Sequence, residues 1–223
     1  MNSRTTENYL KAVYRHSRDN PDQGVSLGII ADDLGVTPGT VTQMMKHLAG
    51  RGLVTYRSRQ GASLTKLGEK TALGIIRRHR LIELFLVEVM GFDWADVHDE
   101  AEELEHVVSD RLVERMDEML GRPVRDPHGA PIPSARGTMK PGRARSLSDC
   151  EAGTYCLMQV AVESADFLGW LSECALLPGT VFELVRSDPI AGTLSLELPG
   201  NRSLSIGTDA ACNLLVSEAG IEP

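Results

Sequence analysis

Cysteine is scarce in this sequence, and a long apolar run is absent. The four cysteines among 223 residues are Cys150, Cys156, Cys174 and Cys212, and no two of them are separated by two residues. This usage argues against a disulfide framework and against a cysteine-based zinc site. No apolar run reaches the roughly 20 residues needed to cross a bilayer, and the N-terminus lacks the pattern of a secretion signal. We therefore expect a cytoplasmic protein without a membrane partner.

The net charge of -8 is unevenly distributed along the chain. Residues 1–70 carry ten Lys and Arg against six Asp and Glu, whereas residues 71–140 carry nine against fourteen. Residues 141–223 carry four against eleven. The total charge argues against a nucleic-acid partner, but the basic excess at one end favours an anionic partner for that segment.

The first 70 residues are typical of short helices followed by a β-hairpin. Ser26 can cap a helix that ends at Gly35, and the stretch "VTPGT" turns into a second helix. Two short helices joined by a turn that contains glycine form a helix-turn-helix motif. The following stretch, "LVTYRSRQGASLTKLG", predicts two strands around an arginine-bearing tip. We therefore predict a winged helix-turn-helix domain over residues 1–70.

The second helix of this motif begins with short polar side chains, as base recognition in the major groove requires. Gln43 can form two hydrogen bonds with adenine, and a threonine or proline can pack on the thymine methyl group. Winged helices also mediate protein contacts, but the basic excess favours double-stranded DNA. The residues expected at DNA are Arg4, Thr37, Pro38, Gly39, Thr40, Thr42, Gln43, Lys46, Arg57 and Arg59. Because a single winged helix-turn-helix domain makes few contacts with DNA, specific binding should require a dimer that reads two half-sites.

Residues 98–106, "HDEAEELEH", place two histidines and five carboxylates in nine residues. One long helix over residues 94–121 would align part of this cluster beside an apolar stripe. The aligned residues are His98, Glu102, Glu105 and His106, with His79 and Glu83 sharing a face of the preceding helix. A solvated acidic face explains the other glutamates, but crowded carboxylates beside a core repel one another unless a cation neutralises them. The pattern favours two ion sites, and ligands without thiolate suit manganese or ferrous iron.

A hydrolytic metal centre is a further interpretation of this cluster. The HExxH spacing is absent, and the chain contains neither a glycine-rich phosphate loop nor a nucleophile elbow. We therefore expect no catalytic residues and no organic cofactor.

The chain changes character after a stretch rich in proline, glycine and basic residues. We assign residues 71–140 to a helical domain and residues 141–146 to a linker. From residue 147 onward, five short stretches such as "TLSLEL" have the composition of strands between Gly and Pro turns. They predict a small β-barrel over residues 147–223 in a mainly α-helical chain. A barrel of this size could instead be a peptide-binding module.

Six stretches are specific to one family in their combination and order: "TTENYL", "VTPGTVTQMMKHLAGRGLV", "RRHRLIELFL", "VHDEAEELEHVVSD", "DPHGAPIP" and "VESADF". Together they resemble the diphtheria toxin repressor family of metal-dependent transcription regulators, over nearly the whole chain. The resemblance implies a homodimer formed through residues 71–140 and an SH3-like C-terminal barrel. It implies a primary metal site at Asn8, Glu102, Glu105 and His106, with a backbone carbonyl near 102. It implies an ancillary metal site at His79, Glu83, His98, Glu163 and Asp166.

Three residues depart from patterns within this family. Position 102 is typically cysteine in iron-type members, whereas Glu102 is similar to manganese-type members, and a hard carboxylate favours manganese. Asn8 replaces the usual Met or Asp and brings no charge. Lys11 stands where compact manganese regulators often carry a ligand glutamate, which argues against their binuclear arrangement.

The sequence therefore predicts a repressor that binds DNA as a homodimer when it holds Mn²⁺, or else Fe²⁺, and that controls metal-homeostasis genes. An ion that joins Asn8 on the first helix to Glu105 and His106 would fix the orientation of the DNA-binding domain. The alternative is a winged-helix regulator that responds to an organic ligand or a protein partner, with an acidic helix that is merely solvated.

Overall fold

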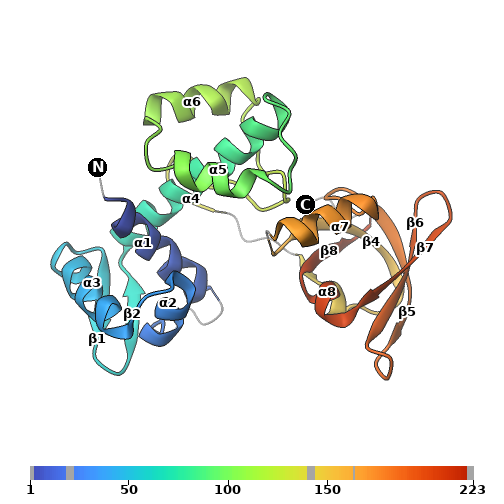
Figure 1. The fold of residues 1–223 in the computed structure, drawn as a ribbon, viewed down its shortest axis with the longest axis horizontal. Helices are drawn as coiled ribbons and strands as arrows, with labels where there is room; N and C mark the ends of the chain where they lie inside the picture. The colour runs from blue at the N-terminus through green and yellow to red at the C-terminus, as the bar shows by residue number, and fades with distance from the viewer. Residues whose placement is uncertain (1–2, 19–22, 140–143, 163, 220–223) are drawn as a thin grey trace. The chain divides into compact units, whose positions relative to one another are not determined.

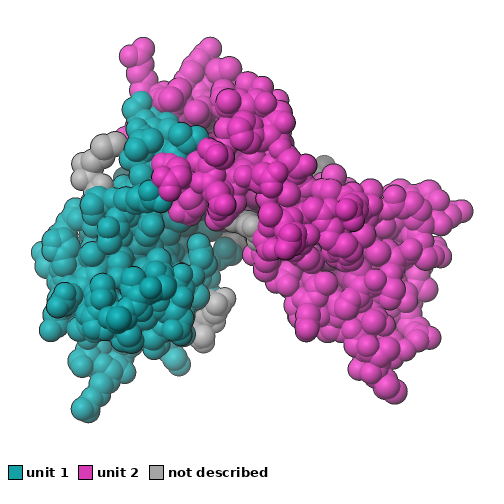
Figure 2. Space-filling model, viewed as in Figure 1, with its two compact units in different colours: residues 1–79, 104–109, 133–139 teal, residues 80–103, 110–132, 140–223 magenta. Residues whose placement is uncertain are grey.

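The computed structural model describes residues 3–18, 23–139, 144–162 and 164–219. The chain divides into two compact units (Figure 2). Unit 1 comprises residues 1–79, 104–109 and 133–139, and unit 2 comprises residues 80–103, 110–132 and 140–223. One boundary between them falls inside helix α4 (Lys66–Glu88), directly after His79.

Unit 1 contains the helix-turn-helix motif and its wing (Figure 1, blue to cyan). Its elements are α1 (Arg4–Ser17), α2 (Leu27–Leu34), α3 (Pro38–Gly50), β1 (Val54–Arg57), β2 (Gly61–Leu64) and the first part of α4. The side chains of Ser3, Ser26 and Thr37 cap the three helices by accepting backbone N–H groups. Gly35 ends α2 in the left-handed conformation, at φ 62°. The predicted winged helix-turn-helix is confirmed.

One apolar core holds these elements together. Its fully buried members include Leu10, Ile30, Val41, Met45 and Leu48. The two wing strands pair antiparallel, and Arg57 lies opposite Gly61 next to the tip. The core thereby fixes α3 and the wing on one rigid support, while their polar ends stay exposed.

The segment over residues 94–121 differs from the single helix that the sequence predicts there. The chain instead forms α5 (Val97–Leu104) and α6 (Asp110–Met119), with a turn between them. Ser109 and Asp110 are residues of the type that begins a helix, and this local signal outweighs the apolar periodicity. Glu105 and His106 therefore lie in a turn after α5. Among the described residues, no helix is both long and apolar enough to cross a membrane.

The C-terminal part of unit 2 is a six-stranded antiparallel sheet (Figure 1, yellow to red). Its elements are β3 (Arg145–Ser146), a 3-10 turn (Leu147–Asp149), β4 (Gly153–Val160), α7 (Ala165–Glu173), β5 (Val181–Asp188), β6 (Thr193–Leu198), β7 (Arg202–Gly207), α8 (Thr208–Cys212) and β8 (Leu214–Glu218). The strand order is β3-β8-β4-β5-β6-β7. Along β6, Leu194, Leu196 and Leu198 are buried and alternate with less buried residues, as a sheet with one solvated face requires. The predicted SH3-like barrel is confirmed.

The barrel contains one strand more than the five predicted. Arg145 and Ser146, placed in the linker 141–146 by the sequence, form β3 and pair with β8. Two residues are too few to show an alternating pattern, so this strand had no sequence signal. Residues 140–143 lie outside the described residues.

Candidate functional site

Glu105 is fully buried in unit 1. Its Oε1 lies 2.8 Å from Nζ of Lys11 on α1, and its Oε2 lies 2.8 Å from Nδ1 of His79 on α4. Burial raises the pKa of this carboxyl, but the hydrogen bond with His79 and the charge of Lys11 outweigh burial, so the pKa lies below its ordinary value. Glu105 is therefore a buried anion with a polar partner at each oxygen.

His106 and Asn8 add buried lone pairs to the same unit. Nδ1 of His106 lies 2.7 Å from Oε2 of Glu7, so in the neutral ring Nδ1 carries the proton and Nε2 is an acceptor. Nε2 lies 3.4 Å from Oε1 of Glu105 and has no hydrogen-bond partner among the described residues. Oδ1 of Asn8 is also buried, again without a hydrogen-bond partner in the part of the chain that the structure describes. Buried acceptors of this kind are unfavourable unless a proton donor or a cation reaches them, so this donor set fits a metal ion.

Glu102 precedes Glu105 by three residues and is half-buried. A carboxylate oxygen from each of these residues and a ring nitrogen of His79 all lie within 4.8 Å of one another. The structure thus brings Glu102, Glu105 and His106 of the predicted primary site together. Asn8 follows Glu7, the residue that contacts His106.

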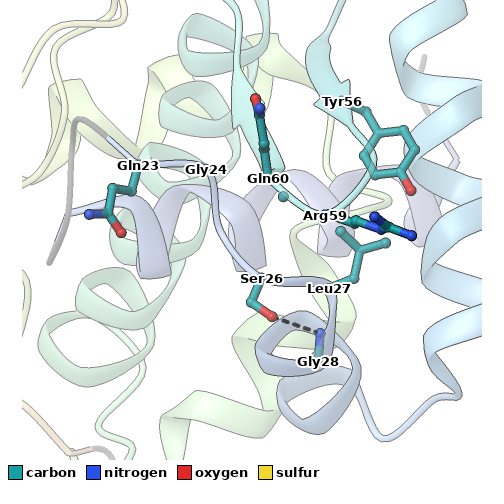
Figure 3. Close-up of a pocket in the computed structure, with 9 residues that line it drawn as sticks. Gln23, Gly24, Ser26, Leu27, Gly28, Tyr56, Arg59 and Gln60 are labelled. Carbon is teal, nitrogen blue, oxygen red and sulfur yellow. Dashed lines mark hydrogen bonds between the residues drawn. The ribbon is translucent and has the colours of Figure 1, made fainter.

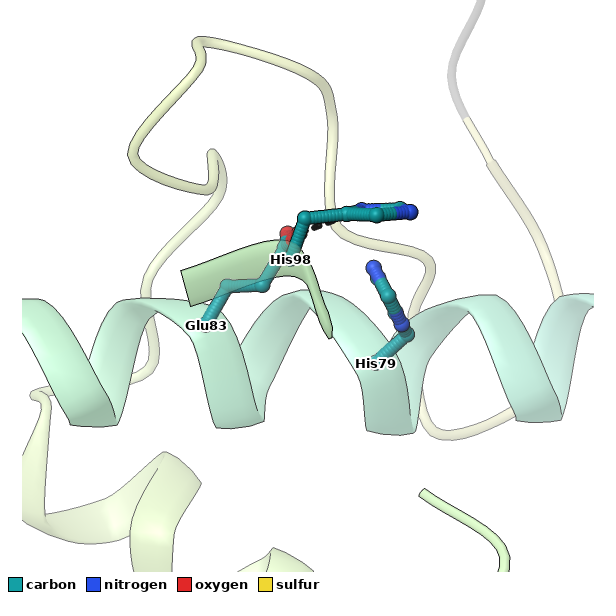
Figure 4. A group of neighbouring side chains, drawn as sticks. All are labelled: His79, Glu83 and His98. Carbon is teal, nitrogen blue, oxygen red and sulfur yellow. Dashed lines mark hydrogen bonds and ion pairs between the residues drawn. The ribbon is translucent and has the colours of Figure 1, made fainter. Parts of the chain in front are cut away.

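A second group of ligand atoms surrounds Glu83, which is fully buried on α4. Ligand atoms of His79, Glu83 and His98 lie within 4.8 Å of one another, and Nδ1 of His98 is 3.4 Å from Oε1 of Glu83 (Figure 4). His79 and Glu83 project from one side of α4, as expected from their i, i+4 spacing. Because Nδ1 of His79 contacts Glu105 while a ring nitrogen of His79 also lies in the group with Glu83, this residue belongs to both groups of ligand atoms.

Asp126 is a buried residue near this group that was not predicted as a ligand from the sequence. Its Oδ1 accepts the backbone N–H groups of His128 and Ala130, and its Oδ2 lies 3.2 Å from Nε of Arg80. Burial raises the pKa of Asp126 to about 7, and the charge of Arg80 offsets this only in part. The stretch "DPHGAPIP" contained a sequence signal for this ligand, because two residues of types that bind metals, Asp126 and His128, come just before a glycine there.

His128 is the second candidate ligand missed from the sequence. Nε2 of its fully buried ring lies 2.8 Å from the backbone carbonyl oxygen of Trp94, so Nε2 carries the proton and donates it. Nδ1 is then an acceptor, 3.9 Å from Oε2 of Glu83 and without a hydrogen-bond partner in the described part of the chain. Ligand atoms of Glu83, Asp126 and His128 lie within 4.8 Å of one another. Glu83 thus presents one oxygen to His98 and the other to His128.

The two ligands expected from the C-terminal domain are not part of these groups. Glu163 lies outside the described residues, and Asp166 is exposed in the first turn of α7. No potential metal-ligand group found among the described residues contains Asp166. The C-terminal domain instead supports the loop that carries His128, because the Val160 N–H on β4 donates to the His128 carbonyl at 2.9 Å.

The residues expected at DNA lie on α1, α3 and the wing. Arg4, Thr37, Pro38, Gly39, Thr40, Gln43, Lys46, Arg57 and Arg59 are exposed. Thr42 is half-buried, and its hydroxyl donates to the Pro38 carbonyl at 2.9 Å within the same helix. Its methyl group rather than its hydroxyl is therefore the part available to a base.

A hollow of 630 Å³ lies between the wing and the start of α2 (Figure 3). Ser26, Gly28, Tyr56 and Arg59 are among the residues that line it. The side chain of Ser26 accepts the Gly28 N–H at 3.3 Å. A helix N-terminus next to an arginine suits a phosphate group, so this surface fits the backbone of a nucleic acid.

Comparisons with known proteins agree with this geometry. Residues 1–62 match the family described as "Iron dependent repressor, N-terminal DNA binding domain", and residues 65–134 match "Iron dependent repressor, metal binding and dimerisation domain". Iron-dependent repressor IdeR of Mycobacterium leprae is 36% identical over 225 residues, covering 93% of this chain and 94% of that protein. The diphtheria toxin repressor of Corynebacterium diphtheriae is 36% identical over 131 residues, covering 58% of this chain and 56% of the relative.

Solved structures of similar proteins share the whole fold. A structure described as "Manganese-dependent transcriptional repressor complex with manganese" matches with a TM-score of 0.87 and 34% identity, covering 96% of this chain and 99% of that one. ScaR with bound Zn²⁺ matches with a TM-score of 0.79 and 33% identity, covering 96% and 99%. The chain therefore belongs to the iron-dependent repressor family, a family of metal-dependent, DNA-binding transcriptional regulators rather than of enzymes.

Proposed function

We propose that this protein represses metal-homeostasis genes by binding their operators as a homodimer when it holds Mn²⁺, with Fe²⁺ as the alternative ion. One observation carries the proposal. A buried set of acceptors around Glu105 includes residues of α1, and α1 is part of the winged helix-turn-helix core. An ion bound by these acceptors would therefore be attached directly to the DNA-binding domain.

The primary ion would be held by Asn8, Glu102, Glu105 and His106. Asn8 lies on α1, whereas the other three belong to α5 and the turn after it. An ion that joins α1 to this turn would limit the orientations open to the winged helix-turn-helix domain. It would thereby also limit the spacing of the two copies of α3, the recognition helix, in a dimer. Such a ligand shifts the equilibrium only to the extent that it binds the DNA-competent state more tightly.

A second ion would lie at Glu83. His79 and His98 supply nitrogen ligands next to Glu83, and we add His128 to the residues that can take part. The Trp94 carbonyl fixes the ring of His128 through Nε2, which is the usual support of a ligating histidine. Two ions for each chain follow from these two groups.

Manganese is favoured over iron by the donor set. The ligand atoms around Glu83 and Glu105 are carboxylate oxygens and imidazole nitrogens, and Glu102 stands where a thiolate would favour softer metals. Relatives with this fold include both iron-dependent and manganese-dependent repressors by name, so the fold alone is compatible with either ion.

A dimer is supported by apolar side chains that remain exposed in the described chain. Leu112 and Met119 on α6 are 47% and 54% exposed, in the part of the chain that matches the family's dimerisation domain. A second copy of the chain is the partner that would bury them. The two DNA-binding domains of one dimer would provide the paired recognition helices that specific operator binding needs.

Fluorescence anisotropy tests the proposal on DNA from upstream of this protein's own gene, at fixed salt, with Mn²⁺, Fe²⁺ or a chelator. We expect tight binding with Mn²⁺ and none with the chelator. Glu105→Ala and His106→Ala should abolish the metal response while circular dichroism shows a folded protein. Glu100→Ala removes an exposed carboxylate from the same segment and should leave the response unchanged. Equal DNA binding with metal and with chelator, or a full response in either site variant, contradicts the proposal.

A further inference from the structure

Lys11 is a buried lysine on α1, next to the proposed primary ion site. Its side chain is only 10% exposed, and its ammonium lies 2.8 Å from Oε1 of the fully buried Glu105. Lysine is almost never buried unless it is paired with an anion. This pairing joins residues 94 positions apart in the chain, so it results from the tertiary fold.

The oxygen that faces Lys11 is the same oxygen that faces the proposed ligand His106. Oε1 of Glu105 lies 3.4 Å from Nε2 of His106, while Oε2 is engaged by His79. An ion bound between Glu105 and His106 would therefore approach Oε1, where the ammonium now lies. Two cations that share one carboxylate oxygen repel each other strongly in a buried setting, because little water screens them.

We propose that Lys11 is a resident counter-cation that a divalent ion must displace from Glu105, so that Lys11 sets the metal concentration at which the protein responds. This inference rests on the proposed function, since it requires that Glu105 and His106 hold the activating ion. In the metal-free protein the ammonium neutralises Glu105 and so stabilises the fold without metal. In the metal-bound protein the ion provides that charge, and Lys11 must withdraw or remain in a repulsive position.

A purely structural role for Lys11 predicts a different result. If Lys11 only anchored α1, its removal would weaken the metal-free and metal-bound proteins alike. If Lys11 competes with the ion, its removal destabilises the metal-free protein alone and tightens metal binding. The two roles are therefore distinguished by metal affinity together with thermal stability.

The test uses Lys11→Met, which keeps an apolar stem and removes the charge, in the full-length protein. Lys66→Met is the matched control, because it removes the same charge from an exposed site in unit 1. Mn²⁺ affinity is measured by competition with a chromogenic chelator, and the melting temperature is measured with and without Mn²⁺. We expect Lys11→Met to bind Mn²⁺ roughly tenfold more tightly or better, to melt earlier without metal and to show a larger metal-induced rise in melting temperature. Lys66→Met should match the wild type in all three.

Unchanged or weaker Mn²⁺ binding by a folded Lys11→Met variant overturns the inference. Lys11→Gln provides a second variant in case Lys11→Met does not fold, because its amide can still donate a hydrogen bond to Glu105 without a charge. It should also bind Mn²⁺ more tightly than the wild type, and failure to do so overturns the inference equally. If the wild type binds no more Mn²⁺ than Glu105→Ala does, the proposed function itself fails, which separates the two conclusions.

Discussion

Nδ1 of His79 lies 2.8 Å from Oε2 of Glu105, and this contact joins the two proposed ion sites. Glu105 is a proposed ligand of the first ion, and the same histidine offers a ring nitrogen to the group with Glu83 and His98. A carboxylate that accepts the N–H of a ligating histidine fixes the ring and increases its basicity. The two sites should therefore not fill independently.

His79→Ala should weaken both steps of Mn²⁺ binding, because it removes a ligand from one site and the partner of Glu105 from the other. We expect a loss of roughly tenfold or more at each step, as for other residues that orient metal ligands. Glu83→Ala is the matched comparison and should weaken only the second step. Isothermal titration calorimetry resolves the steps, and an effect of His79→Ala on a single step would show that the sites are independent.

His128→Ala should weaken the ion site at Glu83 by about tenfold. The reason is that its Nδ1 is a buried acceptor aimed at Glu83, 3.9 Å from Oε2. His47→Ala removes an exposed imidazole and serves as the control. Unchanged stoichiometry and affinity in His128→Ala would assign this ring a packing role and leave His79 and His98 as the nitrogen ligands.

Gly129→Ala should destabilise the protein strongly, because this glycine fits the His128 loop against β4. A Cβ at this position would lie 2.0 Å from the carbonyl oxygen of Met158, and its φ of 84° disfavours other residues. We expect a loss of about 3 kcal/mol or more in the free energy of unfolding. Gly200→Ala has a similar φ of 82° with open space around it, so it should cost about 1–2 kcal/mol. Thermal or denaturant unfolding measures both, and equal losses would show that the close approach is unimportant.

The features that could be predicted from the sequence are those encoded over short distances. Ser26 and Gly35 mark the two ends of a helix that the structure reproduces, "VTPGT" leads into the next helix, and the alternation in "TLSLEL" marks a strand. The i, i+4 spacing of His79 and Glu83 placed them correctly on one side of α4. Each of these signals acts within one or two turns of backbone.

The features that could not be predicted depend on contacts between distant segments. The approach of Lys11 to Glu105 results from packing of the whole unit, and so does the burial of His128 beside Glu83. The break after Leu104 was missed because Val108 and Leu112 continue the helical spacing across it, although Leu112 proves to be exposed. Periodicity alone does not show whether a helix runs through a turn.

DNA binding should separate base contacts from phosphate contacts. Gln43 is exposed on α3, so Gln43→Ala should reduce affinity for the preferred operator by about 1–3 kcal/mol and relax its base preference. Arg59 is exposed at the wing, so Arg59→Ala should weaken binding to all sequences. It should also reduce the slope of the logarithm of the binding constant against the logarithm of the salt concentration by about one. Anisotropy titrations at several salt concentrations, on operator and scrambled DNA, test both. Equal losses on the two DNAs for Gln43→Ala would remove it from base recognition.

Asn8→Asp should tighten Mn²⁺ binding and weaken the metal-free fold. Oδ1 of Asn8 is a buried acceptor without a hydrogen-bond partner among the described residues, so the position presents a ligand oxygen but brings no charge. A carboxylate there would add a negative charge close to Glu7 and its contact with His106, which is unfavourable until a cation arrives. We expect a gain of roughly tenfold or more in Mn²⁺ affinity and a lower melting temperature without metal. Asn8→Ala, which removes the oxygen, should instead weaken binding, and tighter binding in that variant would show that Asn8 obstructs the ion rather than holds it.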